Sequence, residues 1–304
     1  MTELMHVQHL VVYSADLHGN ESQYRKLVDL AKASSADSII IGGDIAPQRG
    51  TRNHFISIQR DFLSKRLPDL LLPFKEALPD SQIYLMMGND DCACNLDILK
   101  RFDNELFHLI HGRRLRLARR FDIVGYSFVP ITPFMLKDWE KFDLSAVPQT
   151  LATEYDHRKS WNYRLDGFRS TLEGWKRFRF SEAMEREESI QRDLDKSLFT
   201  DNPERTVYIF HSPPDNTRLD QRYDGSHVGS MAIRLFIKEH QPYLTLHGHI
   251  HETVDVSRNF KDTIDRSVSL SVGNHDQGNY TPNDLAVLTF NLFNAEKAER
   301  RIVQ

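Results

Sequence analysis

The chain has 304 residues, of which 40% are hydrophobic and 27% charged, and its formal net charge is −4. This composition is that of an ordinary globular protein, and the slightly acidic balance argues against a surface that binds nucleic acid. No apolar run approaches the roughly 20 residues that cross a bilayer, and the N-terminus shows no signal peptide, so we expect neither a membrane nor a nucleic-acid partner.

Short β-rich runs alternate with helical patterns in the first third of the chain. Proline falls twice in the longest helical pattern, so we expect that helix to break or kink at Pro68 and Pro73. The βαβα order predicts a layered α/β architecture. The expected strands are 6–13, 38–41 and 83–87, and the expected helices are 21–33, 54–77 and 96–102.

The segment 130–204 interrupts this alternation. It contains all three tryptophans, many charged residues and a helical pattern over 181–198. We interpret it as a helical insertion within a single domain, 1–304, where it packs as a cap or as an arm that contacts a second copy in a homodimer. A simple helical elaboration of the core explains the pattern equally well.

The alternation resumes after the insertion, and the last third of the chain is rich in β patterns. No internal repeat is present. Cys92 and Cys94 are the only cysteines, and one residue separates them, so a disulfide would be strained and we expect a cytoplasmic protein. The expected strands here are 206–210, 243–246, 267–272 and 285–292, and the expected helix is 228–239.

Residues that bind metals recur where the expected strands end. In α/β sheets, ligands gather outside the carboxyl ends of the strands, so side chains from five separate segments can converge on one point. A lone aspartate after a strand is more often a turn or cap residue, and the five motifs carry weight only together. These residues are Asp16, His18, Asp44, Asn89, His211, His247, His249 and His251.

The ligand types indicate a borderline divalent metal. Carboxylate, amide and imidazole groups without a thiolate suit Mn, Fe, Zn or Co better than Ca or a closed structural zinc site. Either Asp16 or Asp44 is expected to bridge two ions. Two such ions can hold a hydroxide between them, and this hydroxide would attack the phosphorus of a small phosphorylated substrate in line.

The ordered set Asp-x-His, Gly-Asp, Gly-Asn-Asp, His and Gly-His-x-His resembles the calcineurin-like metallophosphoesterase superfamily, over Asp16 to His251. The run from His211 to Ser230 is similar to a group of small prokaryotic phosphoesterases. The resemblance implies a four-layer αββα sandwich, with two mixed β-sheets flanked by helices, and a phosphomonoesterase or phosphodiesterase activity. It implies that Asp44 bridges two metal ions. It places Asp16, His18 and His251 on one ion, and Asn89, His211 and His249 on the other.

One departure from the family pattern affects catalysis. Many members carry histidine at the position of Asp90, where it helps to orient the phosphate or protonate the leaving group. An aspartate beside two cations stays ionised and is a poor acid at neutral pH. His227 and His275 are the alternative candidates for that acid. We also expect Asp91 to orient its neighbours. Gly229-Ser230 lies at the start of a helix, where it would contact phosphate, and an ordinary N-cap role for Ser230 explains the pattern equally well.

A second copy of the third motif, Gly273-Asn274-His275-Asp276, competes for the role of Asn89. It follows the Gly-His-x-His motif and so breaks the family order, and we therefore assign the ligand to Asn89. A nuclease, a scaffold without activity and a structural zinc protein remain competing functions. The acidic charge argues against the first, the complete ligand set against the second and the cysteine-poor ligands against the third.

Overall fold

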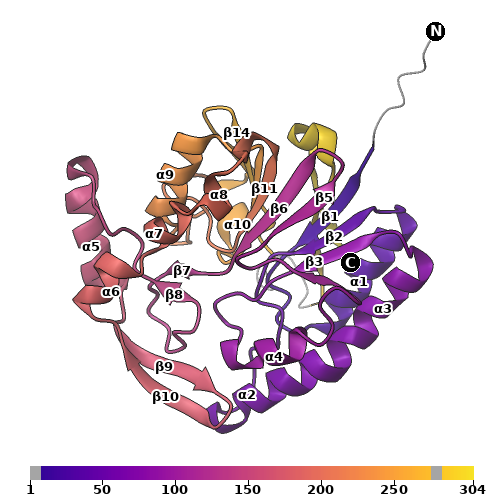
Figure 1. Cartoon of the computed structure of the whole chain (residues 1–304), viewed down its shortest axis with the longest axis horizontal. Coiled ribbons are helices and arrows are strands. Elements are labelled where there is room, and N and C mark those ends of the chain that lie inside the picture. The colour runs from indigo at the N-terminus through magenta and orange to yellow at the C-terminus, as the bar shows by residue number, and fades with distance from the viewer. Residues whose placement is uncertain (1–7, 275–282) are drawn as a thin grey trace.

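The computed structural model describes residues 8–274 and 283–304, and it consists of two six-stranded sheets that face each other (Figure 1). The first sheet has the order β16 (Glu299–Val303), β15 (Leu285–Asn291), β1 (Leu10–Ser14), β2 (Ser38–Ile41), β3 (Gln82–Leu85) and β4 (His108–Leu109). The second has the order β13 (Lys261–Ile264), β14 (Ser267–Ser271), β12 (Leu244–His247), β11 (Thr206–Phe210), β6 (Phe121–Tyr126) and β5 (Arg114–Ala118). Both sheets mix parallel and antiparallel pairs.

The central strands are buried on both faces because each sheet packs between two layers. Successive side chains of a strand point to opposite faces. In β2, Ile39 and Ile41 join the core beneath the helices, whereas Ile40 joins the core between the sheets. This explains why these strands are continuous apolar runs without polar alternation.

Helices cover the outer face of each sheet (Figure 1). Asn20 caps α1 (Glu21–Ala33) by accepting hydrogen bonds from Ser22 N and Gln23 N, and the apolar side of the helix packs on the first sheet. The helix α9 (Met231–His240) packs in the same way on the second sheet. The four-layer αββα sandwich expected from the sequence is confirmed.

The long helix before β3 continues through both prolines. It consists of α2 (Arg52–Asp61), the π-helical turn η1 (Phe62–Arg66) and α3 (Leu67–Ala77). A proline ring clashes with the carbonyl four residues earlier in a regular α-helix. The wider turn that precedes Pro68 relieves this clash, and the helix therefore does not break there.

The insertion contains a β-hairpin that the sequence patterns did not predict. The strands β9 (Asp166–Thr171) and β10 (Gly174–Arg179) pair antiparallel. The helical pattern 181–198 forms separate short helices instead of one long helix. The helices of this segment are α5 (Ala152–Asn162), α6 (Glu182–Glu187), α7 (Ile190–Leu194) and α8 (Ser197–Thr200), and the short strands β7 (Val129–Pro130) and β8 (Glu140–Lys141) pair near its start.

The insertion contacts the loop that follows β3. Trp139 Nε1 donates to the carbonyl of Asp91 at 2.9 Å, and Ala93 N donates to Asp138 Oδ2 at 2.8 Å. This loop continues into the short helices η2 (Ala93–Asn95) and α4 (Leu96–Leu99). The remaining short elements are η3 (Gln149–Leu151), η4 (Pro203–Arg205), α10 (Thr253–Ser257) and η5 (Leu292–Lys297). Among the described residues, none of the helices has the length and apolar character needed to span a bilayer.

Candidate metal centre

The residues expected to bind metal follow the carboxyl ends of strands in both sheets. Asp16, Asp44 and Asn89 follow β1, β2 and β3, which are parallel neighbours in the first sheet. His211 follows β11, and the Gly-His-x-His motif follows β12, its parallel neighbour in the second sheet. Because neighbouring parallel strands end at the same edge, these loops meet at one end of the sandwich.

The backbone at this end adopts conformations that non-glycine residues rarely take. Asp16, His18, Asp44 and His249 have φ angles of 57°, 43°, 51° and 67°. A left-handed conformation costs roughly 1–2 kcal/mol for a residue with a Cβ atom. Strain of this kind persists where the surrounding structure holds it in place, and it is concentrated at functional sites.

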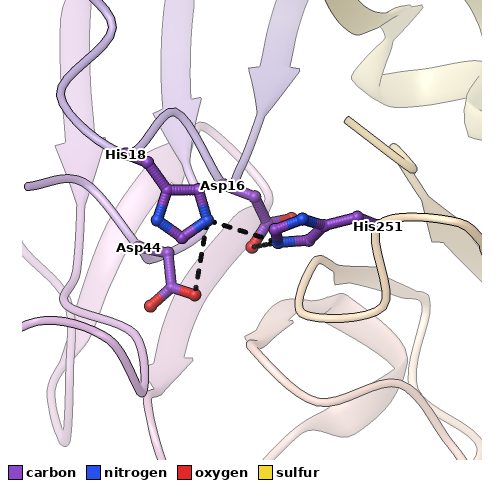
Figure 2. A group of neighbouring side chains, drawn as sticks. All are labelled: Asp16, His18, Asp44 and His251. Atoms are coloured by element: carbon purple, nitrogen blue, oxygen red, sulfur yellow. Dashed lines mark hydrogen bonds and ion pairs between the residues drawn. The ribbon is translucent and has the colours of Figure 1, made fainter. Parts of the chain in front are cut away.

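Asp16, His18 and His251 form what we call the outer ligand group (Figure 2). His18 Nε2 lies 3.3 Å from His251 Nε2, and His251 Nε2 lies 3.8 Å from Asp16 Oδ1. Asp44 Oδ2 lies 4.0 Å from His18 Nε2. One ligand atom from each of these four residues lies within 4.8 Å of the others. Nitrogen and oxygen atoms that converge in this way fit a single cation between them.

Asn89, His211 and His249 are the residues that we call the inner ligand group, and His211 Nε2 also lies 4.0 Å from Asp16 Oδ1 of the outer group. His211 Nε2 lies 3.0 Å from Asn89 Oδ1 and 3.3 Å from Asp44 Oδ2. His211 Nδ1 donates to the carbonyl of Gly42 at 2.8 Å, which directs Nε2 toward Asp44. The ring centroid of His249 lies 5.4 Å from that of His211.

The charges of the site favour a bound cation. Burial alone would lower the pKa of His211, but Asp44 and Asp16 raise it to about 10. Burial would likewise raise the pKa of Asp44, yet the positive charge on His211 holds it below its usual value. Burial and the charge of His211 lower the pKa of His249 to about 3, so this imidazole is neutral. The buried carboxylates therefore attract a positive charge, which either a proton on His211 or a bound cation supplies.

Glycines let the backbone approach the carboxylates closely. A Cβ atom on Gly88 would lie 2.3 Å from Asp44 Oδ1 and 2.4 Å from Asp44 N. A Cβ atom on Gly248 would lie 2.7 Å from Asp16 Oδ2. Contacts this short are impossible for a side chain, so glycine is required beside both carboxylates.

Asp91 ties the loops after β2 and β3 together. Its buried carboxylate accepts hydrogen bonds from Gly88 N at 2.8 Å, Ile45 N at 3.0 Å and Ala46 N at 2.8 Å. The contacts agree with the expectation that Asp91 orients its neighbours.

Asn274 has a structural role that the sequence did not reveal. Its Nδ2 donates to the carbonyls of Ala15 and Asp16 at 3.2 and 3.1 Å, and its Oδ1 accepts from Ala286 N at 3.0 Å. The amide therefore holds the loop of Asp16. The sequence did not distinguish a ligand copy from a loop anchor except by motif order.

The three candidate catalytic residues lie in different surroundings. Asp90 accepts from Gln48 Nε2 at 2.7 Å and from Asn89 Nδ2 at 3.1 Å, so it borders the inner ligand group. Burial and the negative charge of Asp44 raise the pKa of Asp90. His227 Nδ1 lies 2.7 Å from Oδ1 of the buried Asp220. His275 lies outside the described residues.

Of the two alternatives for Gly229-Ser230, the structure favours the N-cap role of Ser230 over a phosphate contact. Ser230 caps α9, and the buried carboxylate of Asp143 accepts hydrogen bonds from Ser230 Oγ at 2.5 Å and Met231 N at 2.6 Å. The start of this helix already holds an anion, which the insertion supplies.

His247 is not part of the ligand groups. Its Nδ1 lies 3.0 Å from the carbonyl of Ser212, and its Nε2 lies 2.8 Å from Thr245 Oγ1. Both ring nitrogens are therefore used within the strand ends, and His247 packs beside the site.

A family model described as calcineurin-like phosphoesterase matches residues 10–253. The chain belongs to this family. It is therefore an enzyme that hydrolyses phosphoesters with the help of bound metal, and the outer ligand group together with Asp44 supplies a cluster that fits a metal ion. No curated protein sequence matches the chain.

Solved structures resemble the chain over almost its whole length. The protein TT1561 of Thermus thermophilus is 14% identical with a TM-score of 0.55, and the match covers 98% of this chain and 100% of that chain. This likeness shows the fold. A dimetal phosphatase from Danio rerio is 13% identical with a TM-score of 0.48, and the match covers 97% and 98% of the two chains.

Proposed function

We propose that the chain is a dinuclear phosphoesterase that acts on small phosphomonoesters or phosphodiesters. The outer ligand group would hold one ion, the inner ligand group would hold the other, and Asp44 would bind both. The observation that carries this proposal is the position of Asp44 Oδ2, which lies 3.3 Å from His211 Nε2 and 4.0 Å from His18 Nε2. When bound, two divalent cations neutralise the charge on phosphate oxygens and make water more acidic.

The residues of this chain would orient and balance the charge of the site. His211 is anchored on the Gly42 carbonyl, and the backbone N–H of His249 donates to Asp16 Oδ1 at 3.0 Å. We propose Mn, Fe, Zn or Co as the bound ions, because carboxylate, amide and imidazole groups without a thiolate suit them. Both cysteines are free thiols, which supports our proposal of a cytoplasmic location.

The role of the insertion follows from its contacts with the site loops. We propose that 130–204 belongs to the single domain 1–304, because Trp139 and Asp138 bond to the loop after β3. A cap over the site, a dimer arm and a simple helical elaboration of the core remain the alternatives, and the first two differ in the oligomeric state they need. Light scattering at micromolar concentration distinguishes them, because an arm requires a homodimer and a cap is compatible with a monomer.

Metal depletion tests the proposed function. Protein stripped with a chelator should lose activity on 4-nitrophenyl phosphate and bis(4-nitrophenyl) phosphate, and adding Mn, Fe, Zn or Co should restore it. Comparing the two esters distinguishes a monoesterase from a diesterase. A folded protein that hydrolyses neither ester with any of these metals would contradict the proposal.

We expect the site to donate a proton to the leaving group poorly. We propose that Asp90 cannot replace the imidazole of its relatives as an acid once cations lie beside it, and that His227 or His275 gives whatever help remains. General acid catalysis contributes about 10²–10⁴-fold, so activity should fall steeply from aryl to alkyl esters. The measurement is kcat/KM across esters of graded leaving-group pKa for the native chain, Asp90→His, His227→Gln and His275→Ala. If kcat/KM varied little with leaving-group pKa in all four proteins, the hypothesis that the site lacks a general acid would be refuted.

A further inference from the structure

A pocket of about 780 Å³ extends from the outer ligand group to the loop that follows β2. Its lining includes Asp16, His18 and His251 of the outer ligand group together with Gln48 and Arg49. Sites for small molecules commonly have volumes of about 300–1,000 Å³. The pocket therefore has room for a substrate much larger than a phosphate group.

Arg49 is a cation without a partner in this pocket. It is the only lysine or arginine in the described lining, and its side chain is exposed. No ion pair or hydrogen bond joins its guanidinium to any residue within 8–274 or 283–304. A guanidinium that is free in this way can form two parallel hydrogen bonds with a carboxylate or a phosphate.

Glu21 lines the same pocket but does not compensate Arg49. Its carboxylate accepts from Arg66 Nη2 at 2.6 Å and from Arg25 Nη2 at 2.8 Å. The hydrogen bond from Arg66 lowers the pKa of Glu21 to about 2, so the group is charged and is balanced by two other arginines. The positive charge of Arg49 therefore remains available to a ligand.

The rest of the lining is polar. Asn20, Ser22 and Gln23 lie at the start of α1, and Leu17 is the only residue with an apolar side chain in the described lining. The first N–H groups of α1 are used by the Asn20 cap, so this helix start does not itself bind an anion. A lining of this kind suits a hydroxylated chain or ring better than an apolar group.

We infer that Arg49 binds a second anionic group, a carboxylate or a phosphate, on a polar phosphoester whose reacting phosphate lies at the ligand groups. The pocket would then offer two positive charges, that of bound metal at the ligand groups and that of Arg49. The inference rests on the proposed phosphoesterase function, because that function places the reacting phosphate. Because each positive charge attracts one anionic group, esters with a single anionic group would bind more weakly.

The test uses three ligands that share a six-carbon polyol with a phosphate ester on carbon 6. They differ only at carbon 1: 6-phosphogluconate has a carboxylate, 6-phosphogluconamide a neutral carboxamide and glucitol 1,6-bisphosphate a phosphate. Titration calorimetry on the Mn-loaded protein gives their dissociation constants, and inhibition of 4-nitrophenyl phosphate hydrolysis gives a second readout. The proteins are the native chain, Arg49→Gln, Arg49→Lys and Arg52→Gln.

Arg49→Gln should weaken binding of the carboxylate or the bisphosphate by about tenfold and leave the carboxamide unchanged. Arg49→Lys should recover part of this loss because it keeps the charge. Arg52 is the matched control, since it is also exposed but stacks over Phe168 at 3.5 Å, outside the pocket lining. Its variant should bind all three ligands normally.

Equal binding of the carboxamide and both anions by the native chain would overturn the inference, as would an equal loss of all three ligands in Arg49→Gln. The ligand with the larger loss identifies the second anion as carboxylate or phosphate, and either result supports the inference. Failure of the proposed function is a separate result. In that case no phosphoester is hydrolysed, while the calorimetric preference for the anions and its loss in Arg49→Gln can still be measured.

Discussion

We propose that the outer and inner ligand groups share Asp44, and His18 and His251 differ from His211 in burial and in anchorage. The side chains of His18 and His251 are 19% and 29% exposed, whereas His211 is fully buried. The carbonyl of Gly42 fixes the ring of His211, but His18 Nδ1 has no hydrogen-bond partner in the described parts of the chain. Partners of this kind orient a metal-binding histidine and typically change metal affinity by about 10–100-fold.

The difference follows from where each group lies in the sandwich. The inner group lies against the closely packed loops of β2, β3 and β11, where Gly88 admits the carboxylate of Asp44. The outer group lines the pocket. We therefore expect the inner group to hold its ion tightly and the outer group to exchange its ion with solvent.

The largest effect should come from the residue that the two groups share. Asp44→Asn removes one negative charge from both, so we expect kcat/KM to fall on the order of 10³-fold or more. The fold should remain, because the amide keeps the shape of the side chain. Asp29→Asn, at an exposed carboxylate on α1, is the control and should be unaffected. Near-normal hydrolysis of 4-nitrophenyl phosphate by Asp44→Asn would show that the groups act independently.

Histidine variants should separate the two groups. Both His211→Gln and His251→Gln should lose activity at low metal concentration, by about 100-fold if each ligand is worth a few kcal/mol. Millimolar Mn should rescue His251→Gln, because its ion exchanges from an open pocket, and should not rescue His211→Gln. The measurement is activity against metal concentration. Equal rescue of both variants would remove the distinction between an open and a closed group.

The sequence predicted the strands whose ends carry the proposed ligands, because these strands are local patterns. The helix 21–33 and the strands 38–41 and 206–210 have the expected bounds, and parallel strands bring their carboxyl ends to one edge. These local patterns were enough to bring the loops of the proposed ligands to one end of the sandwich, whereas metal binding by these residues stays a prediction.

Two of the features that were missed depend on contacts between distant residues. Asp143 caps α9 from 87 residues away, and Asn274 reaches Ala15 across 259 residues, so neither contact leaves a local pattern. The hairpin β9–β10 was missed because most of its side chains are only half-buried, which weakens the apolar alternation.

Asn274→Ala should affect the outer group more than the inner group. It removes hydrogen bonds to the backbone of Ala15 and Asp16, and leaving buried polar groups without partners costs about 1–3 kcal/mol of unfolding free energy. Chemical denaturation should show this loss, and metal titration should show weaker binding at the outer group only. Asn89→Ala is the comparison and should weaken the inner ion. If Asn274→Ala weakened the inner ion and Asn89→Ala the outer ion, the two asparagines would have the opposite roles.

The smallest effect should come from the insertion. Trp139→Phe keeps an aromatic ring but removes the indole hydrogen bond to the carbonyl of Asp91. We expect a loss of about 1 kcal/mol in unfolding free energy. Because Asp91 positions the loops of Asp44 and Asn89, affinity for the inner ion should fall slightly. Trp175→Phe, which loses a bond to the carbonyl of Arg52 on the surface, is the control. A stronger effect on the outer ion would show that the insertion supports the other group.

The central claim is that one carboxylate, that of Asp44, joins two metal sites of unequal exposure. The most direct test is anomalous X-ray diffraction from crystals of the Mn-loaded protein, measured before and after a short soak in chelator. We predict two anomalous peaks per chain, one on each side of the Asp44 carboxylate, and the peak beside His18 and His251 should disappear first. A single peak, or two peaks of which neither contacts Asp44, would contradict the account.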